Sequence, residues 1–373
     1  MKKNIPNIIL LVSLACIIAF FSISYILLPD STFSEDENRV LQSAPKFTIE
    51  KLLDGTYTRQ LHDYFSDQIP LRTIMIRLKA SIELALGKNE NNGVLLGKDG
   101  YLIEVCSYTE DNLSYLKRNL TKIENLMSSL QGNEIKVISA IIPRKVDVLS
   151  NKFSPYYSYE RNSAIWELVS DNHVSLTYTL SQWQNSGKEI FYKTDHHWTA
   201  DGAYYAYVSL IELLDYAPKS INHFDFELLS DEFYGTSYSK SGFFFASSDS
   251  IYAPKIDESR YTTTIVDIGK SFPGLYDTNY LVKKDKYSVF LSGNNAHVKI
   301  TDNQDESKET LLLIKDSFSH SLAPYLLEHY NLELIDPRYY IGSIEEYIIE
   351  NDIKNVLFIF GLDTLASANI SIR

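Results

Sequence analysis

The chain has 373 residues, of which 45% are hydrophobic, so it is long enough to bury a full core and to form two domains. Its formal net charge of −13 and its pI near 5.1 argue against a nucleic-acid-binding surface, and we expect no nucleic-acid partner. The 27 tyrosines and 18 phenylalanines are compatible with sugar-stacking aromatics, but the same residues are common in ordinary β-rich cores.

The first segment is an uninterrupted apolar run. Residues 8–28 (IILLVSLACIIAFFSISYILL) carry no charge, and this length is enough to span a bilayer. Because Lys2 and Lys3 precede the run, the positive-inside rule predicts a single-pass anchor over residues 1–28, with a cytoplasmic N-terminus and the rest of the chain extracellular. A cleaved signal peptide is the alternative, although no convincing small-x-small cleavage site follows the run.

Residues 29–90 are predicted to be a juxtamembrane helical segment. Apolar residues recur at helical spacing across 71–86, and Gly87 is placed as a helix stop. We expect two or three helices here, packed onto the main domain. The next stretch, GVLLGKDGYLIE at 93–104, predicts a β-hairpin because two β-rich runs flank Lys-Asp-Gly.

Residues 91–373 are predicted to be an extracellular catalytic domain of the α/β class. Helical patterns alternate with continuous apolar runs, which predicts a mostly parallel sheet covered by helices on both faces. The predicted strands are at 135–143, 174–180, 310–316, 332–336 and 355–361. Residues 220–300 are rich in Tyr, Phe, Ser and Asp with short β-like runs, and we interpret them as a β-rich insertion.

The motif TDHHW at 194–198 decides which chemistry is open to the chain. If the motif is extended, Asp195 and His197 share one face, so the carboxylate can fix the tautomer of an imidazole base. His196 then faces the other way, in a structural role or at a substrate-binding edge. Adjacent strand histidines chelate one ion poorly, and the other histidines are scattered, so no metal site is expected. A structural, hydrogen-bonded histidine pair is the alternative. Thr199 is placed to cap a following helix.

A partner for such a base is predicted near residue 317. The run TLLLIKDSFSHSLAPYLLEHY (310–330) reads as a buried strand, a turn and a helix. Ser317 lies at the turn, where the first free helical N–H groups can face a developing oxyanion, and Ser319 is its close competitor. The alternative for Ser317 alone is a simple helix cap.

At these residues the chain resembles the DHHW family of bacterial surface proteins and, more remotely, the SGNH-hydrolase-like alginate O-acetylation proteins AlgJ and AlgX. The resemblance is carried by several motifs together, which span nearly all of the chain beyond the anchor. They are SEDENRVLQSAPKF (34–47), FSDQIPLR (65–72), NGVLLGKDGYLIE (92–104), TDHHWTADGAYYAY (194–207), FYGTSYSKSG (233–242), KYSVFLSGNNA (286–296) and IKDSFSHSLAPYL (314–326).

The resemblance implies an SGNH-hydrolase-like fold and a triad in permuted order, with Asp195 as orienter, His197 as base and Ser317 as nucleophile. It also implies an enzyme that moves acetyl groups onto an extracellular polysaccharide. Such enzymes often act beside a membrane-bound O-acyltransferase of the MBOAT type that supplies the acetyl groups. No cofactor is expected.

Five further residues are weaker candidates for oxyanion or substrate contact. Asn294 can offer an amide to the oxyanion, although Gly-Asn pairs are more often plain turns. Lys145 follows a predicted strand end and is placed to reach sugar groups, with a solvated surface lysine as the alternative. Tyr238 and Lys240 are loop candidates for substrate contact. Trp198 is expected either to stack on a sugar ring or to be buried behind the histidines.

These patterns favour an extracytoplasmic polysaccharide O-acetyltransferase with an acetyl-enzyme intermediate. A carbohydrate acetylesterase with the same triad is an alternative, as is a non-catalytic protein that binds glycan in an SGNH-like cleft. A metal-dependent hydrolase would instead depend on both histidines and be sensitive to chelators.

Overall fold

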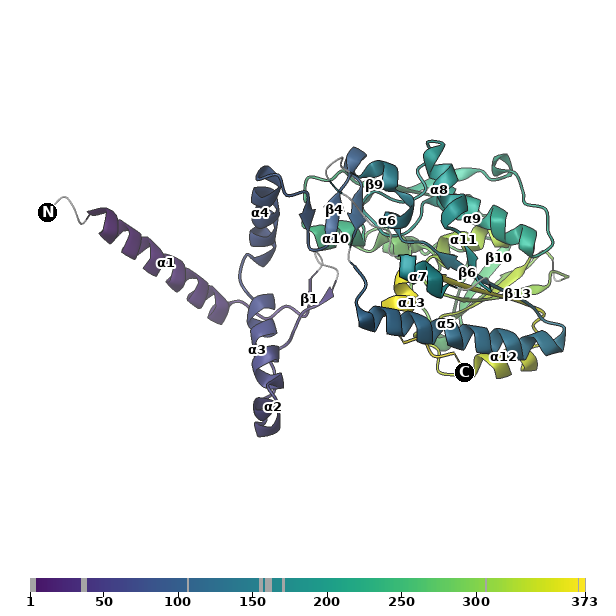
Figure 1. Ribbon diagram of the computed structural model, residues 1–373, viewed down its shortest axis with the longest axis horizontal. Helices are drawn as coiled ribbons and strands as arrows, with labels where there is room; N and C mark the ends of the chain where they lie inside the picture. Colours follow the sequence, from purple (N-terminus) through teal and green to yellow (C-terminus); the bar gives the residue numbers. More distant parts are fainter. Residues whose placement is uncertain are drawn as a thin grey trace. The chain divides into compact units, whose positions relative to one another are not determined.

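The structure, a computed structural model, describes residues 5–34, 39–105, 107–153, 157, 163–169, 172–305, 307–367 and 369–372. The chain forms two compact units (Figure 1). The first unit comprises Met1–Lys88 with Gly242–Phe244, and the second comprises Asn89–Ser241 with Phe245–Arg373. The candidate site lies in the second unit.

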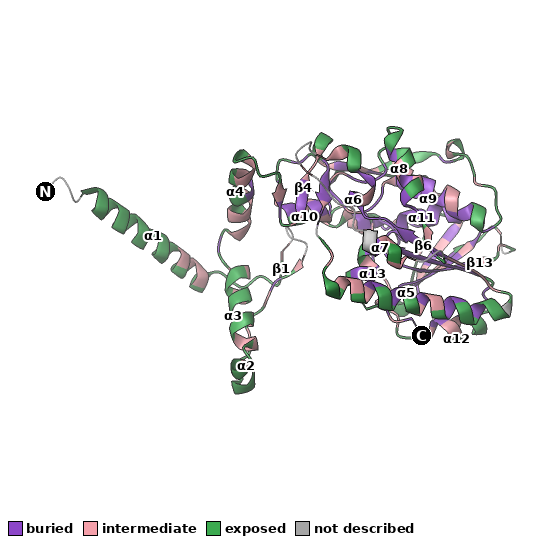
Figure 2. Cartoon of the chain, viewed as in Figure 1, coloured by how far each residue is buried: buried purple, intermediate pink, exposed green. Residues whose placement is uncertain are grey.

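The first unit begins with a long apolar helix, α1 (Ile5–Leu27). Its 23 residues extend about 35 Å at 1.5 Å per residue, enough to cross the hydrocarbon core of a bilayer. The mean hydropathy of its most apolar part is 2.6, and the side chains are largely exposed, as the green ribbon in Figure 2 shows. The apolar helix predicted over residues 8–28 is therefore present. Lys2 and Lys3, on which the predicted orientation depends, lie outside the described residues.

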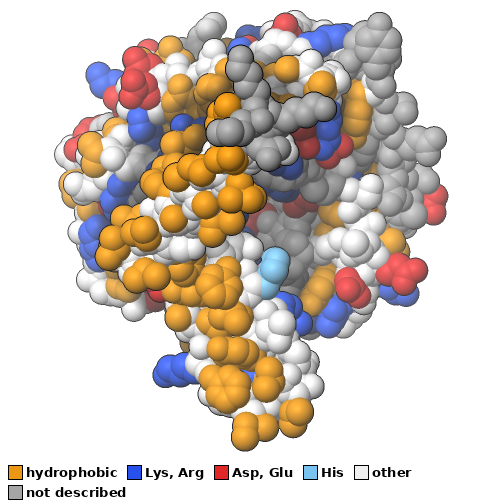
Figure 3. All heavy atoms as spheres, turned by 90° about the vertical axis from the view of Figure 1, so that its left-hand side faces the viewer, with side chains coloured by type: hydrophobic (Ala, Val, Ile, Leu, Met, Phe, Trp, Pro, Cys, Tyr) orange, Lys and Arg blue, Asp and Glu red, His pale blue; other side chains and the backbone are white. Residues whose placement is uncertain are grey.

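Shorter elements follow in the same unit. They are α2 (Ile49–Leu53), α3 (Thr56–Asp67), α4 (Arg72–Ala85) and the antiparallel strands β1 (Phe33–Ser34) and β2 (Arg39–Val40). Helix α4 follows the predicted apolar spacing and ends before Gly87, whose φ of 88° is a left-handed conformation that favours glycine. Figure 3 shows apolar side chains, in orange, gathered on the face in view. The exposed apolar side chains of this unit include Ile74, Leu78 and Ile82 on one side of α4.

The second unit begins with the predicted hairpin. Strand β4 (Val94–Leu96) pairs antiparallel with β5 (Leu102–Glu104) and with the short β3 (Glu90–Asn91). The turn between β4 and β5 contains Asp99 and Gly100, both with positive φ. The hairpin prediction is therefore confirmed, and its turn residues explain the reversal.

The core of the second unit is an eight-stranded sheet in the order β11-β10-β12-β14-β13-β15-β6-β7. All pairings from β14 to β7 are parallel, and those from β11 to β14 are antiparallel. The strands are β6 (Lys136–Ile142), β7 (Val174–Ser175), β10 (Tyr261–Ile265), β11 (Lys270–Pro273), β12 (His297–Asp302), β13 (Thr310–Lys315), β14 (Asn331–Ile335) and β15 (Asn355–Gly361). The predicted α/β class with a mostly parallel central sheet is confirmed.

Helices cover both faces of this sheet (Figure 1). Along β13, Leu311 and Leu313 enter one apolar cluster, whereas Leu312 and Ile314 enter the other, as the two-residue strand period requires. The first cluster packs under α6 (Lys145–Val148), α8 (Thr177–Asn185), α9 (Ala200–Leu213) and α11 (Ser319–Leu326). The second packs under α5 (Glu110–Leu130), α7 (Ser163–Leu168), α12 (Ile344–Glu350) and α13 (Leu362–Ser367).

Two predictions in this unit need correction or refinement. The strand predicted over residues 174–180 is wrong for most of its length, because β7 covers only Val174–Ser175 and the chain then enters α8. A short apolar run fits helix and strand spacing equally, and packing of Leu180 into the core selects the helix.

Within residues 220–300, β8 (Phe226–Phe233) and β9 (Asp249–Pro254) form a separate pair joined by α10 (Thr236–Ser241), whereas β10, β11 and β12 extend the central sheet. The domain boundaries drawn at residues 28, 90 and 220–300 stay predictions.

Helix α9 supplies a test of local stability. Thr199 caps it, because the Thr199 hydroxyl accepts the N–H of Gly202 at 3.2 Å and donates to the carbonyl of Glu189 at 2.6 Å. We expect Thr199→Ala to lower the free energy of unfolding by about 1 kcal/mol, the usual cost of losing an N-cap. Thr199→Ser, which keeps the hydroxyl, should lose less. Urea unfolding measures both, and an Ala variant with the wild-type midpoint and slope would contradict the assignment.

Candidate active site

The TDHHW motif lies in a bent loop and not in the extended segment that its residue types predict. An antiparallel bridge joins Phe191 to Trp198 and closes the loop. The bend has a local cause, because the carboxylate of Asp195 accepts the backbone N–H of His197 at 2.9 Å. The prediction that His196 points away from His197 is therefore wrong: the two ring centroids are 3.9 Å apart.

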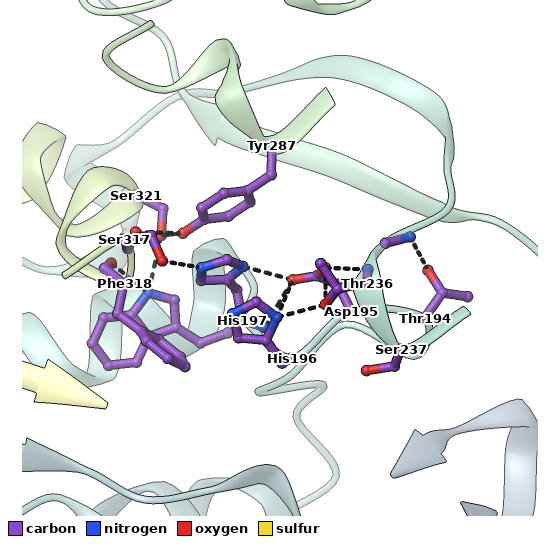
Figure 4. Close-up of polar contacts among 12 residues, drawn as sticks. Thr194, Asp195, His196, His197, Thr236, Ser237, Tyr287, Ser317, Phe318 and Ser321 are labelled. Atoms are coloured by element: carbon purple, nitrogen blue, oxygen red, sulfur yellow. Dashed lines mark hydrogen bonds and ion pairs between the residues drawn. The ribbon is translucent and has the colours of Figure 1, made fainter. Parts of the chain in front are cut away.

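Asp195 is buried and fully hydrogen-bonded. Its Oδ1 lies 2.6 Å from Nδ1 of His197, and its Oδ2 accepts the backbone N–H and the hydroxyl of Thr236 at 2.7 and 3.0 Å (Figure 4). Gly235 lies so close that a Cβ there would overlap the Asp195 side chain. Burial by itself raises the pKa of this carboxyl, but the charges of His196 and His197 and the hydrogen bonds outweigh burial and hold the pKa well below its usual range. Asp195 is therefore a carboxylate at neutral pH.

The hydroxyl of Ser317 lies next to the second ring nitrogen of His197. Its Oγ lies 2.8 Å from His197 Nε2, so an unbroken line of hydrogen bonds joins Asp195, His197 and Ser317 (Figure 4). Ser317 lies in the turn between β13 and α11 and is partly exposed. Its competitor Ser319 is buried and donates to the carbonyl of Asp316 at 2.9 Å. The two serines thus differ in access and in partner.

The turn that carries Ser317 is held by Asp316. The Oδ2 atom of Asp316 accepts the N–H of Gly361 at 2.8 Å and the hydroxyl of Thr364 at 2.6 Å, so the turn is tied to the end of β15. Its Oδ1 accepts the N–H of Phe318 at 3.1 Å.

Backbone bonds also occupy the next two N–H groups at the start of α11. The N–H of Ser319 donates to Asp316, and the N–H of His320 donates to Ser317. The expectation that the first helical N–H groups are free for an oxyanion is therefore wrong for residues 318–320. The N–H of Ser317 itself makes no hydrogen bond within the described part of the chain.

Two aromatic residues hold the imidazole and the serine turn together. The ring of Tyr287 stacks on His197, with centroids 3.8 Å apart and planes 9° apart, and its hydroxyl contacts Ser321 Oγ at 3.0 Å. Trp198 is fully buried and donates its Nε1–H to the same Ser321 oxygen at 2.9 Å and to the carbonyl of Phe318. Trp198 therefore follows the buried alternative, with no face open to a sugar ring. Sequence reasoning missed Tyr287, although it lies in the KYSVFLSGNNA motif.

His197 is placed to remain neutral. Burial lowers its pKa, and the positive charge of His196 lowers it further, whereas Asp195 opposes both effects. The net direction is a pKa below the ordinary value of 6.5. A neutral imidazole whose Nδ1–H is held by a carboxylate presents a bare Nε2 to the Ser317 hydroxyl.

Lys145 is buried and does not reach solvent as a surface lysine would. Its Nζ donates to the backbone carbonyls of Leu102, Lys193 and Asp195 at 2.7–2.9 Å. Burial lowers its pKa to about 8, against the attraction of nearby carboxylates. Lys145 therefore fastens the Asp195 loop to the β4–β5 hairpin. The alternative of a solvated surface lysine is therefore wrong, whereas a substrate contact stays a prediction, because Lys145 also lines a pocket beside His196.

The remaining residues that the sequence suggested for substrate or oxyanion contact differ in their exposure and in their hydrogen-bond partners. His196 is partly exposed, and its Nδ1 lies 2.6 Å from Thr236 Oγ1. Lys240 is exposed and pairs with Glu104 at 2.6 Å, and Tyr238 donates its N–H to the carbonyl of Thr194. Asn294 is exposed in the loop before β12, and no contact joins it to Ser317 among the described residues. Its oxyanion role stays a prediction.

A pocket of about 130 Å³ lies beside the histidines. His196 and Phe318 line it together with Arg144, Glu104 and Asp363. It offers polar groups of both charges next to the partly exposed Ser317. A small acyl donor or one hydroxyl of an acceptor fits this amount of space.

Asp195, His196 and His197 are also a group whose ligand atoms all lie within 4.8 Å of one another. The argument that the two histidines diverge is therefore wrong. The nitrogens nearest to Asp195 already face Asp195 or Thr236, and His197 Nε2 faces Ser317. A bound ion would have to replace these hydrogen bonds, so the donor set fits acid–base chemistry better than chelation.

Together, the fold and this centre define an α/β protein with a Ser–His–Asp hydrogen-bonded array at the carboxyl edge of its parallel strands. The profile of the DHHW protein family matches residues 107–335, more than half of the chain. The chain therefore belongs to the DHHW family. The matched range includes the TDHHW loop and Ser317, whereas the resembling motifs at 34–47, 65–72 and 92–104 lie outside it.

Solved structures share the fold. A DHHW family protein from Eubacterium siraeum superposes with a TM-score of 0.61 and 22% sequence identity, covering 75% of this chain and 94% of that one. PatB1 from Bacillus cereus superposes with a TM-score of 0.60 and 17% identity, covering 74% of this chain and 97% of PatB1. At these identities the likeness concerns the fold.

Curated relatives align over a shorter region. The probable alginate O-acetylase AlgJ of Pseudomonas fluorescens is 24% identical over 164 residues, which is 41% of this chain and 41% of AlgJ. The protein of the same name from Pseudomonas putida is 25% identical over 185 residues, which is 46% of this chain and 47% of that relative. The chain thus spans less than half the length of these relatives.

The electrostatics of the histidine pair are directly testable. We expect the imidazole of His197 to titrate below pH 6.5 in the folded protein, because burial and His196 both disfavour its protonation. His196→Asn removes the neighbouring imidazole that disfavours protonation of His197 and should raise the midpoint. NMR titration of the imidazole signals measures both values. The matched control is His223→Asn, at an exposed histidine paired with Glu328. A midpoint above 6.5, or one unchanged by His196→Asn, would contradict this account.

Proposed function

We propose that this protein is an extracytoplasmic O-acetyltransferase that acts on a cell-surface or secreted polysaccharide through Ser317, His197 and Asp195. The observation that carries the proposal is the pair of contacts on His197, 2.6 Å to Asp195 and 2.8 Å to Ser317. Geometry of this kind activates a serine hydroxyl for acyl transfer. The relatives named alginate O-acetylase supply the class of acyl group and of acceptor.

In the first half-reaction, His197 Nε2 takes the proton of Ser317 Oγ while that oxygen forms a bond to the acetyl carbonyl carbon. Asp195 keeps the imidazole in the required tautomer and stabilises the imidazolium that forms. The donor's leaving group then departs with the proton from His197, and the acetyl group stays on Ser317. A neutral His197 is the competent form, which agrees with the downward direction of its pKa.

In the second half-reaction, a sugar hydroxyl gives its proton to His197, and its oxygen attacks the acetyl-enzyme. Ser317 Oγ leaves and recovers the proton. In both halves the negative carbonyl oxygen needs donors, each worth about 3 kcal/mol in a preorganised site. The backbone N–H of Ser317 is the candidate at the turn, since the next N–H groups are already bonded, and the side-chain amide of Asn294 stays a second candidate.

The proposed location of the chemistry is supported by α1. We place the helix in the cytoplasmic membrane as a single-pass anchor, with the N-terminus in the cytoplasm and the catalytic unit outside. Because acetyl donors such as acyl thioesters are made inside the cell, the acetyl group must first cross the membrane. A membrane-bound O-acyltransferase of the MBOAT type is the partner that fits this need.

The nucleophile assignment predicts a large effect of one substitution. Ser317→Ala should lower kcat/KM for a chromogenic acetyl ester at least about 10³-fold, because the attacking oxygen is lost. Ser319→Ala is the matched control and should keep most of the activity, since that hydroxyl is buried against a carbonyl. Trapping with a sulfonyl fluoride and peptide mass mapping should label Ser317. Retained ester turnover in Ser317→Ala would refute the proposed mechanism.

A second experiment distinguishes acetyl transfer to a sugar from hydrolysis of the acetyl ester. We expect the second unit, incubated with an acetyl ester and neutral oligosaccharides, to form O-acetylated oligosaccharide that mass spectrometry detects. Acetate released without acetylated sugar would identify an esterase instead. Binding of sugar with no turnover of any ester would indicate a glycan-binding protein.

A further inference from the structure

A second and larger pocket contacts the residues just before and just after the TDHHW motif, at 191–193 and 199–201. It has a volume of about 400 Å³ and is lined by residues of the loop, of the start of α9, and of β8 and β9. It shares no lining residue with the pocket beside His196. Its most informative members are Phe226, Tyr252, Asp201, Glu189 and Asp249.

The aromatic members form a platform on one face of the β8–β9 pair. Leu228 pairs directly with Tyr252, and Phe226 is two residues before Leu228, so all three side chains are on the same face of this two-stranded sheet. Phe226 is 37% exposed and Tyr252 is 48% exposed. Exposed rings at the edge of a pocket offer electron-rich faces to the polarised C–H groups of a sugar ring.

The polar members can receive sugar hydroxyls. The Asp201 carboxylate is in the first turn of α9 and makes no hydrogen bond within the described ranges. Glu189 has a side chain that is 65% exposed, and its contact with Lys193 at 3.1 Å leaves further oxygen lone pairs open. Carboxylates interleaved with aromatic faces provide the acceptors and the apolar surface that a ring with many hydroxyls requires.

The charge of this second pocket, which we call the groove, favours some classes of sugar over others. Glu189, Asp201 and Asp249 contribute three carboxyl groups, and Lys193 contributes one ammonium group. A uronic-acid chain would bring more negative charge into this surface, which like-charge repulsion disfavours. Electrically neutral hexose or N-acetylhexosamine units carry no such penalty.

The groove is linked to the catalytic loop through Asp249. Its carboxylate accepts the backbone N–H groups of Lys193 and Thr194 at 2.8 and 2.7 Å and the Thr194 hydroxyl at 2.6 Å. Thr194 immediately precedes Asp195. A chain bound in the groove therefore rests against the loop that carries Asp195 and His197.

We propose that this groove is a binding subsite for a stretch of neutral polysaccharide, which it holds while another part of the same chain is acetylated at Ser317. The inference rests on the proposed acetyl transfer for its purpose, but binding in the groove can be measured without catalysis. Substitutions of groove residues that weaken sugar binding should raise the KM for the polysaccharide acceptor. They should leave kcat for a small acetyl ester unchanged, because no groove residue contacts Ser317.

The experiment uses the full chain carrying Ser317→Ala, so that no turnover occurs. Isothermal titration calorimetry is run with neutral hexasaccharides of glucose, galactose and N-acetylglucosamine, and with hexagalacturonate as the anionic probe. We expect at least one neutral probe to bind. Tyr252→Ala and Asp201→Asn should each weaken that binding about tenfold. The matched control is Tyr178→Ala, at an exposed tyrosine of α8 outside the groove, which should bind as tightly as the parent.

Several outcomes would overturn the inference: no binding of any neutral probe, binding by both groove variants as tight as by the parent, or binding of hexagalacturonate that is tighter than that of the neutral probes. Thermal unfolding of each variant, and wild-type ester turnover by Tyr252→Ala with Ser317 intact, show that the substitutions leave the fold and the catalytic centre in place. Failure of the proposed function has a different readout, since it is judged by ester turnover in Ser317→Ala and not by sugar binding.

Discussion

The candidate site depends on one buried carboxylate. Asp195 is enclosed by Gly235, Thr236 and the loop that it bends, and each of its oxygens accepts at least two hydrogen bonds or close contacts. An ionised group at this depth is tolerated only because it is fully paired. The same bonds that solvate the carboxylate also shape the loop and orient the imidazole. Structure and chemistry at this position therefore have a single physical origin.

The supports around Asp195 come from segments far apart in the chain. Lys145 ties the loop to the hairpin through three carbonyls, Asp249 holds the two residues before Asp195, and Tyr287 stacks on His197. Ser321 Oγ accepts the Nε1–H of Trp198 and contacts the hydroxyl of Tyr287, which links the histidine loop to the serine turn. The geometry at Ser317 is thus the product of packing across the whole second unit, as preorganised sites require.

The sequence was informative where local pattern decides structure. Continuous apolar runs such as residues 310–316 predicted the parallel strands, and Thr199 predicted a helix start, because burial and capping are read from adjacent residues. It was misleading where one side chain overrides the local pattern. The Asp195 side chain bends a segment whose residue types favour an extended strand. Lys145 is buried with its ammonium group bonded to three carbonyls from distant segments, and its sequence context gives no sign of this burial. The stacking of Tyr287 on His197 depends on a tertiary contact, which spacing in one sequence does not encode. The N–H groups at the start of α11 are instead occupied by a tight local turn around Asp316.

The position of β15 has a consequence for when activity can arise. Residues 355–361 follow every other strand of the central sheet in the chain, yet β15 lies between β13 and β6, and the N–H of Gly361 at its end holds Asp316 beside Ser317. A nascent chain that lacks this segment has a gap in the middle of its sheet and no Gly361 N–H to hold Asp316 beside Ser317. The arrangement of Asp195, His197 and Ser317 is therefore complete only after the last strand of the chain has been synthesised and has entered the middle of the sheet.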